Sequence, residues 1–256
     1  MRDLSRLRED MKELERNMKQ RLLAFLLRNG FTKPEKIRNW TPRHWNWLKE
    51  LKFSHPIQQI VFQEYCDAVL DCEKKVAQAM AEIERALEHY SLAPVAKALM
   101  GLRGVDVTTA FTIVAELGDL SRFDSAPQLM AYLGLVPSEA SSGAKTQRGG
   151  ITKTGNGHVR RVIVEAAWSY RYYARMTQPI LLRQKGLTPD ICAISWEAQK
   201  RLSHRYRHLN HGGKRKTVVA TAIARELSGF IWAIGCHMMG RPVEIPAVSE
   251  ERVKAG

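Results

Sequence analysis

Residues 141–161, "SSGAKTQRGGITKTGNGHVRR", contain hydroxyl groups, glycines and cations but no acidic residue. Cations and free backbone N–H groups bind phosphate, and glycine lets a phosphodiester come close to the backbone. A serine in such a loop, Ser141 or Ser142, has two possible roles. Its hydroxyl stabilises a turn, or it attacks a phosphorus atom as a nucleophile. The segment by itself leaves both roles open.

Positive charge is concentrated around this segment. The chain has 256 residues and a net charge of +14. Residues 141–216 contain 16 Lys and Arg but 3 Asp and Glu, whereas the rest of the chain is close to neutral. Such a basic block is typical of a protein that binds nucleic acid, because each neutralised phosphate releases counterions. A solvated basic surface without a partner is the alternative.

Location and metal binding are constrained by other features. Apolar runs are shorter than a membrane-spanning helix requires, and no signal-like segment opens the chain, so we expect a cytoplasmic, nucleoid-associated protein without membrane contact. The four scattered cysteines predict no disulfide framework. His204, His208 and His211 share a helical face without a cysteine or carboxylate, and Glu116 and Asp119 lack a third acid. We therefore expect no metal site in this chain.

The first 90 residues are predicted to form a helical hairpin. Apolar residues recur at steps of three and four over residues 3–28 and again from residue 56 onwards. Thr41 and Pro42 predict the start of a short connecting helix. An antiparallel coiled coil that supports a homo-oligomer is one interpretation, and ordinary bundle helices are the other. The expected stripe contains Leu4, Leu7, Met11, Leu14, Met18, Leu22 and Phe25, then Ile57, Val61, Tyr65, Ala68, Cys72, Val76, Ala79, Ile83 and Leu87.

Residues 91–240 are predicted to form a compact helical domain, followed by a tail, 241–256. Gly101 and Gly104 bracket a turn like that of a helix-hairpin-helix, where a phosphate could approach Gly104; a plain corner in the core is the alternative. The last helix is almost wholly apolar and should be central. No alternating strand pattern is present, so the fold class is mainly α. Asn156 should cap a helix that buries Val159, Val162, Ile163, Ala166, Ala167 and Tyr170.

The stretch "LRGVDVTTAFTIVAELGDLSRFDSAPQLMAYLGLVPSEASSGAKTQRGGITKTGNGHVRRVIVEAAW" resembles the C-terminal transposase domain of the IS110/IS1111 insertion-sequence family. The resemblance extends over residues 95–235 and includes "AIARELSGFIWAI" in the last helix. Family members resemble RNA-guided DNA recombinases with an N-terminal RuvC-like domain, whose acidic residues hold magnesium, and a C-terminal serine nucleophile. The resemblance implies DNA element ends, target DNA and a guide RNA as partners.

Ser142 is the nucleophile that this resemblance implies, because Ser142 and Gly143 match the Ser-Gly position of the family. The acidic domain would lie before Met1, so we expect Mg²⁺ only together with that domain and no catalysis by this chain alone. A non-catalytic transposase remnant that binds DNA or RNA is the alternative, and a helix-hairpin-helix repair factor would not explain the Ser-Gly loop. The residues predicted to bind nucleic acid are Gly104, Lys145, Arg148, Lys153, Asn156, Arg160 and Arg161.

Overall fold

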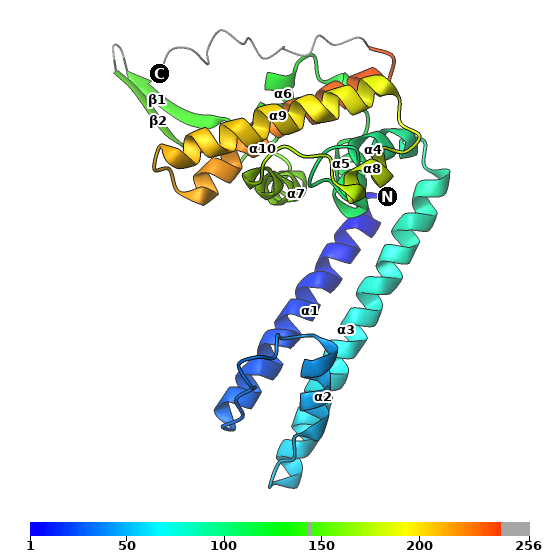
Figure 1. Cartoon of the computed structure of the whole chain (residues 1–256), viewed down its shortest axis with the longest axis vertical. Coiled ribbons are helices and arrows are strands. Elements are labelled where there is room, and N and C mark those ends of the chain that lie inside the picture. Colours follow the sequence, from blue (N-terminus) through cyan, green and yellow to red (C-terminus); the bar gives the residue numbers. More distant parts are fainter. Residues whose placement is uncertain (143–144, 242–256) are drawn as a thin grey trace. The chain divides into compact units, whose positions relative to one another are not determined.

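A computed structural model describes residues 1–142 and 145–241, with the backbone alone over residues 139–148. Helices dominate these ranges, and one antiparallel pair of strands interrupts them (Figure 1). The predicted mainly α fold is confirmed. The chain divides into two compact units, Asp3–Glu82 and Met1–Arg2 with Ile83–Gly256. The predicted tail lies outside the described residues from 242 onwards.

The smaller unit is built from two long helices and a short one. α1 (Arg2–Arg28) and α3 (Pro56–His89) are connected through α2 (Pro42–Glu50). The start of α2 follows the prediction: Pro42 opens the helix, and the Thr41 hydroxyl accepts a hydrogen bond from the His44 backbone N–H at 3.4 Å. This cap satisfies one of the N–H groups that a helix start leaves without a partner.

The core of the smaller unit lies where α2 meets the two long helices. The predicted stripe is correct for Leu22 and Phe25, but Leu7 and Leu14 are 47% and 43% exposed. A straight helix has 3.6 residues per turn, so the apolar face drifts around its axis instead of following one seam. The coiled coil therefore stays a prediction. The buried cluster consists of Leu22, Phe25 and Leu26 of α1, Leu48 of α2, and Phe62, Cys66 and Val69 of α3.

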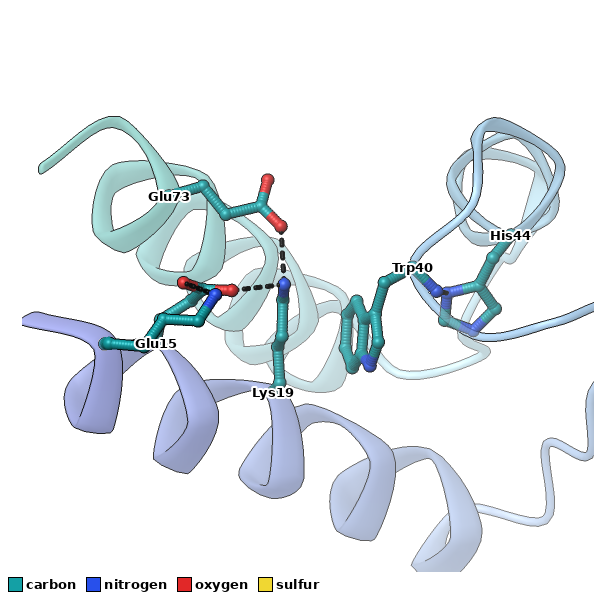
Figure 2. Close-up of polar contacts among 6 residues, drawn as sticks. Glu15, Lys19, Trp40, His44 and Glu73 are labelled. Atoms are coloured by element: carbon teal, nitrogen blue, oxygen red, sulfur yellow. Dashed lines mark hydrogen bonds and ion pairs between the residues drawn. The ribbon is translucent and has the colours of Figure 1, made fainter. Parts of the chain in front are cut away.

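A charged network also connects α1 and α3 (Figure 2). Lys19 Nζ lies 2.6 Å from Glu15 Oε1 and 2.7 Å from Glu73 Oε1, and it lies over the Trp40 ring at 5.1 Å from the centroid. Burial alone would raise the pKa of Glu15, but hydrogen bonds from Lys12 and Lys19 outweigh it and lower that pKa. Lys19 thus connects α1 to α3 through Glu73, and the buried Glu15 carboxylate supports Lys19 from within α1.

Protonation of His44 is predicted to destabilise the smaller unit. The imidazole is buried, and its Nδ1 accepts a hydrogen bond from the Trp40 backbone N–H at 3.2 Å. Burial, with Lys33 as a smaller cause, lowers the pKa of His44 in the folded chain. An unfolded histidine titrates near pH ~6.5. The stability that the neutral His44 side chain contributes is therefore complete above that pH. It is lost as the pH falls toward the lower pKa of His44 in the folded chain.

The measurement is hydrogen exchange of the peptide that spans residues 40–51, corrected for the intrinsic pH dependence of exchange. We expect protection to fall when the pH is lowered from about 7 to about 5.5. His44→Asn offers an amide oxygen as acceptor in place of Nδ1 and cannot titrate, so it should remove this pH dependence. Equal pH dependence in both proteins would contradict the assignment.

Helix α10 is central to the larger unit, as predicted. Its side chains contact α9, α7, α6 and α4, and Trp232 Nε1 donates a hydrogen bond to the Phe123 carbonyl at 2.9 Å. Within the described ranges α10 is the single helix long and apolar enough to cross a membrane, yet 67% of its apolar window is buried inside the fold. Packing in the core accounts for this composition. Figure 1 shows α9 and α10 side by side.

Apart from α9, which is as long as α10, the other elements of this unit are short. They pack around one continuous apolar core that includes the predicted stripe of α7, with Tyr170 fully buried. The elements in chain order are α4 (Ala93–Leu99), α5 (Val107–Leu117), η1 (Leu120–Arg122), α6 (Ala126–Tyr132), β1 (Pro137–Ser142), β2 (Lys145–Ile151), α7 (Gly157–Ala167), η2 (Trp168–Arg171), α8 (Gln178–Gln184), α9 (Pro189–His211) and α10 (Lys216–Met238).

Candidate nucleic-acid interface

The serine-rich segment forms a β-hairpin, which corrects the prediction of a loop from residue 141 onwards. β1 and β2 pair antiparallel, with Ser142 opposite Lys145 and Ser141 opposite Thr146 (Figure 1). The strands contain mostly Ser, Ala, Gly and charged residues. The two strand sequences show no alternation of apolar and polar residues. The hairpin is therefore held by backbone hydrogen bonds between the strands and not by a buried apolar face.

A bulge bends the hairpin near its base. The register shifts between Pro137 and Glu139, so that Ser138 faces the two glycines Gly149 and Gly150. The Ser138 hydroxyl donates a hydrogen bond to the Gly150 carbonyl at 3.0 Å. A Cβ atom on Gly149 would lie 2.5 Å from that hydroxyl oxygen, so a larger residue there would displace the Ser138 side chain and break this hydrogen bond.

Residues 152–155, which follow β2, are fixed against the end of α6. The Lys153 N–H donates to the Gly134 carbonyl at 3.1 Å, and Lys153 itself has a positive φ of 58°. Gly155 has a φ of 70°, and a Cβ atom there would collide with the Tyr132 carbonyl oxygen. The sequence suggested that Gly155 leaves room for a DNA strand, but this glycine makes room for the chain itself. We call residues 132–134 with 152–155 the α6 clamp.

Asn156 caps α7 as predicted and also binds a buried carboxylate. Its Oδ1 accepts the Val159 N–H at 3.0 Å, while its Nδ2 donates to Glu116 Oε2 at 2.7 Å. The Glu116 side chain is fully buried, and Arg2 Nε lies 3.4 Å from the same oxygen. Asn156 therefore positions the start of α7 and keeps Glu116 hydrogen-bonded; its contact with nucleic acid stays a prediction.

The two arginines of α7 differ in their contacts. Arg160 Nη1 donates to the carbonyls of Leu133 and Thr154 at 2.9 and 2.8 Å, which connects α7 to the α6 clamp. Arg161 Nη1 lies 3.0 Å from Glu165 Oε1 in an exposed i,i+4 ion pair. Water screens such a pair, and a phosphate can replace the carboxylate at little cost. Arg161 and the exposed Lys153 are consequently better suited than Arg160 to contact a nucleic acid.

The turn at Gly101–Gly104 is packed against other parts of the larger unit. A Cβ atom on Gly104 would collide with the Ala166 carbonyl oxygen, and Gly104 has a φ of 82°. The buried Gln184 side chain donates to the Gly101 carbonyl at 3.1 Å. Asp106 caps α5, with its Oδ1 accepting the Thr109 N–H at 2.8 Å. These contacts give the glycines a packing role, so phosphate binding at Gly104 stays a prediction.

Ser142 is the last residue of β1, directly before residues 143–144, which lie outside the described residues. Its backbone position next to Lys145 is fixed by the strand register; the side chains of Ser142, Lys145 and Arg148 lie outside the described part of the structure. Among the described residues, no group of three His, Cys, Asp or Glu side chains could hold a metal ion. Asp119 instead caps η1 by accepting the Ser121 N–H at 2.8 Å.

In a comparison with known proteins, the hairpin, the α6 clamp and α7 lie within the region that matches one protein family. Residues 96–179 match the Transposase IS116/IS110/IS902 family. The chain belongs to this transposase family. The match begins in α4 and ends in α8, so it contains all of the glycine-rich basic segment, residues 141–161, including Ser142.

Relatives within this family extend the similarity beyond the matched domain. A protein of Sinorhizobium fredii named as the transposase y4qE is 47% identical over 91% of this chain and 56% of its own length. The transposase for insertion sequence element IS1533 of Leptospira borgpetersenii is 27% identical over 84% of this chain and 62% of its own length. The chain thus spans little more than half the length of these two relatives.

Proposed function

We propose that this chain is the part of an insertion-sequence transposase that cleaves and transfers DNA strands with Ser142 as the nucleophile. Membership of the transposase family supports the reaction class. The observation that carries the residue assignment is the position of Ser142 at the end of β1, beside Lys145, on a hairpin anchored by the α6 clamp. An anchored strand holds a nucleophile more steadily than a loop of the same sequence.

In the proposed reaction the Ser142 Oγ attacks a DNA phosphorus atom and loses its proton to a general base. A phosphoserine ester forms and the P–O3′ bond breaks. The 3′-oxygen takes up the proton that the general base removed from Ser142 and leaves as a hydroxyl. A hydroxyl of the partner strand then attacks the ester and restores the serine. Each step exchanges one ester for another, so no nucleotide cofactor is consumed. Cations near the hairpin would stabilise the charge of the pentacovalent transition state.

Magnesium and the general base are assigned in this proposal to an acidic RuvC-like domain. The described residues of this chain contain no fitting ligand group, so no step is assigned to a metal here. We further propose that a guide RNA and a second copy of the chain take part. Exposed apolar residues of the smaller unit, including Leu27, Ile57 and Ile60, support association between copies.

The test fuses this chain to the region of the Sinorhizobium relative that it does not span. With labelled insertion-sequence ends, RNA and magnesium, the fusion should form a covalent protein–DNA adduct that resists denaturing electrophoresis. This chain alone should bind DNA without an adduct. DNA binding by both proteins with no adduct in either would favour the alternative function, a non-catalytic nucleic-acid-binding remnant.

The basic residues after the hairpin should contribute strongly to duplex binding. We expect Lys153→Gln with Arg161→Gln to weaken duplex binding about tenfold and to reduce the salt slope of log K by about 2, because two phosphate contacts are lost. Arg160 is left intact because it supports the α6 clamp. Fluorescence anisotropy across a salt titration measures both quantities, and an unchanged slope would reject the assignment. Lys200→Gln, in an ion pair with Glu197, is the matched control.

A further inference from the structure

Two exposed tyrosines follow η2 in a segment whose backbone is held in place. The Arg103 guanidinium donates to the Tyr173 carbonyl at 2.7 Å, and the buried Gln199 Oε1 accepts the Arg175 N–H at 3.3 Å. Tyr170, at the start of this segment, is fully buried. The backbone is thus fixed at residues 170, 173 and 175, and the chain there is not a freely moving loop.

The rings of Tyr172 and Tyr173 remain in solvent although this backbone is fixed. They are 55% and 70% exposed, in contrast to Tyr170 at 0%. Burying an aromatic ring stabilises a fold by about 2 kcal/mol, so packing within the chain does not explain two adjacent exposed rings. Exposed aromatic residues in a fixed segment are typical of a binding surface.

Arginines surround these rings. The guanidinium carbons of Arg171 and Arg103 lie 4.7 and 5.9 Å from the Tyr172 ring centroid, and that of Arg207 lies 4.1 Å from the Tyr173 centroid. Within the described ranges none of these three arginines forms an ion pair with a carboxylate. The surface therefore offers flat π faces next to positive charge that no acidic side chain of this surface neutralises.

An unpaired nucleotide has the complementary chemistry. Its base is a flat ring that stacks on tyrosine and guanidinium groups, and its phosphate carries the negative charge that the arginines lack. A duplex hides its base faces in the stack, so it would use the charges but not the rings. An acidic protein would likewise use the charges alone. A single strand can use both the exposed rings and the positive charges of this surface.

We propose that Tyr172 and Tyr173, with Arg103, Arg171 and Arg207, form a platform that stacks unpaired bases of single-stranded nucleic acid. This inference rests on the proposed function, since a strand-transferring protein handles unpaired strands. Single-stranded DNA and single-stranded RNA present the same chemistry to the platform. The tyrosine platform is separate in sequence from Ser142 and from the Lys153 and Arg161 positions that we assign to duplex binding.

The experiment measures anisotropy of the full chain with labelled oligothymidylate, oligouridylate, a DNA duplex of the same length and a polyglutamate peptide. Tyr172→Ala with Tyr173→Ala should weaken single-strand binding at least about tenfold and duplex binding less than about twofold. Tyr172→Phe with Tyr173→Phe keeps both rings and should bind single strands nearly as well as the original chain. Comparing oligothymidylate with oligouridylate shows which strand the tyrosine platform prefers.

Photocrosslinking supplies a second readout. Oligonucleotides with 5-iodouracil should crosslink to the peptide that contains Tyr172 and Tyr173, and the double alanine variant should lose that product. The inference would be overturned if the double alanine variant lost single-strand and duplex affinity equally, lost polyglutamate binding alone, or lost no affinity at all. Retained duplex binding would leave the proposed function standing. A chain that binds neither single strands nor duplex would overturn both.

Discussion

Ser142→Ala is expected to abolish the covalent adduct in the fusion protein, with a loss of at least about 1000-fold. Without the Oγ atom no phosphoserine ester can form, whatever the remaining cations contribute to transition-state stabilisation. DNA binding should change less than about twofold, because one neutral hydroxyl adds little to an affinity dominated by phosphate charge. The measurement is denaturing electrophoresis of labelled DNA, together with anisotropy for the binding step.

Ser141→Ala is the matched control for this experiment. Ser141 and Ser142 are successive residues of β1, and successive positions of a strand alternate between its two faces. A DNA strand that approaches one face should therefore react with only one of the two serines, and Ser141→Ala should keep most of the adduct. An adduct that persists in Ser142→Ala and maps by peptide analysis to Ser141 or Tyr132 would refute the assignment.

The parts of the fold that sequence predicted well are those determined by local pattern. Thr41 with Pro42 and Asn156 are helix starts whose caps need only the next few residues. The buried stripe of α7 follows directly from its 3.6-residue period, and the nearly continuous apolar sequence of α10 indicates a helix covered on most sides. Each of these inferences requires no knowledge of distant residues.

What the sequence did not predict depends on contacts between distant residues. The ion pair between Lys19 and Glu73 joins residues far apart in the sequence, and it forms only once α1 and α3 lie side by side. The β-hairpin lacks the alternating apolar pattern from which strands are inferred, since it is stabilised by backbone pairing at the edge of a helical domain. The helical spacing places Tyr170 in the buried stripe but predicts nothing about Tyr172 and Tyr173. The sequence "RYYAR" places these two tyrosines between arginines, and the structure shows that their rings are exposed.

The glycines show why candidate-site residues need the structure most. Glycine next to a cation indicates either a ligand that approaches the backbone or a second chain segment that does. Gly150 has open space around its hypothetical Cβ, whereas Gly155 has a positive φ and faces the Tyr132 carbonyl oxygen. The two residues stand five positions apart in the same basic segment. Two glycines with similar neighbours in the sequence thus have different roles. Substituting alanine at each position in turn tests this difference.

Gly155→Ala should destabilise the larger unit by about 2 to 5 kcal/mol. A left-handed backbone costs a residue with a Cβ about 1 to 2 kcal/mol, and the collision with Tyr132 adds about 1 to 3 kcal/mol because the backbone of α6 must shift. For a unit of this size such a loss lowers the Tm by about 10 °C. Differential scanning calorimetry of the full chain measures it, with the transition of the larger unit followed separately.

Gly150→Ala is the control, since its Cβ meets nothing within 4 Å and the substitution should shift the Tm by less than about 2 °C. Movement of the α6 clamp also moves the base of the hairpin, because the Lys153 and Thr152 N–H groups bind the carbonyls of Gly134 and Val136 there. Gly155→Ala in the fusion protein should therefore lower adduct formation more than tenfold at a temperature where the unit is still folded. Equal Tm values for the two alanine variants would show that Gly155 does not stabilise the α6 clamp. Full adduct formation in a destabilised Gly155→Ala protein would show that the α6 clamp does not position Ser142.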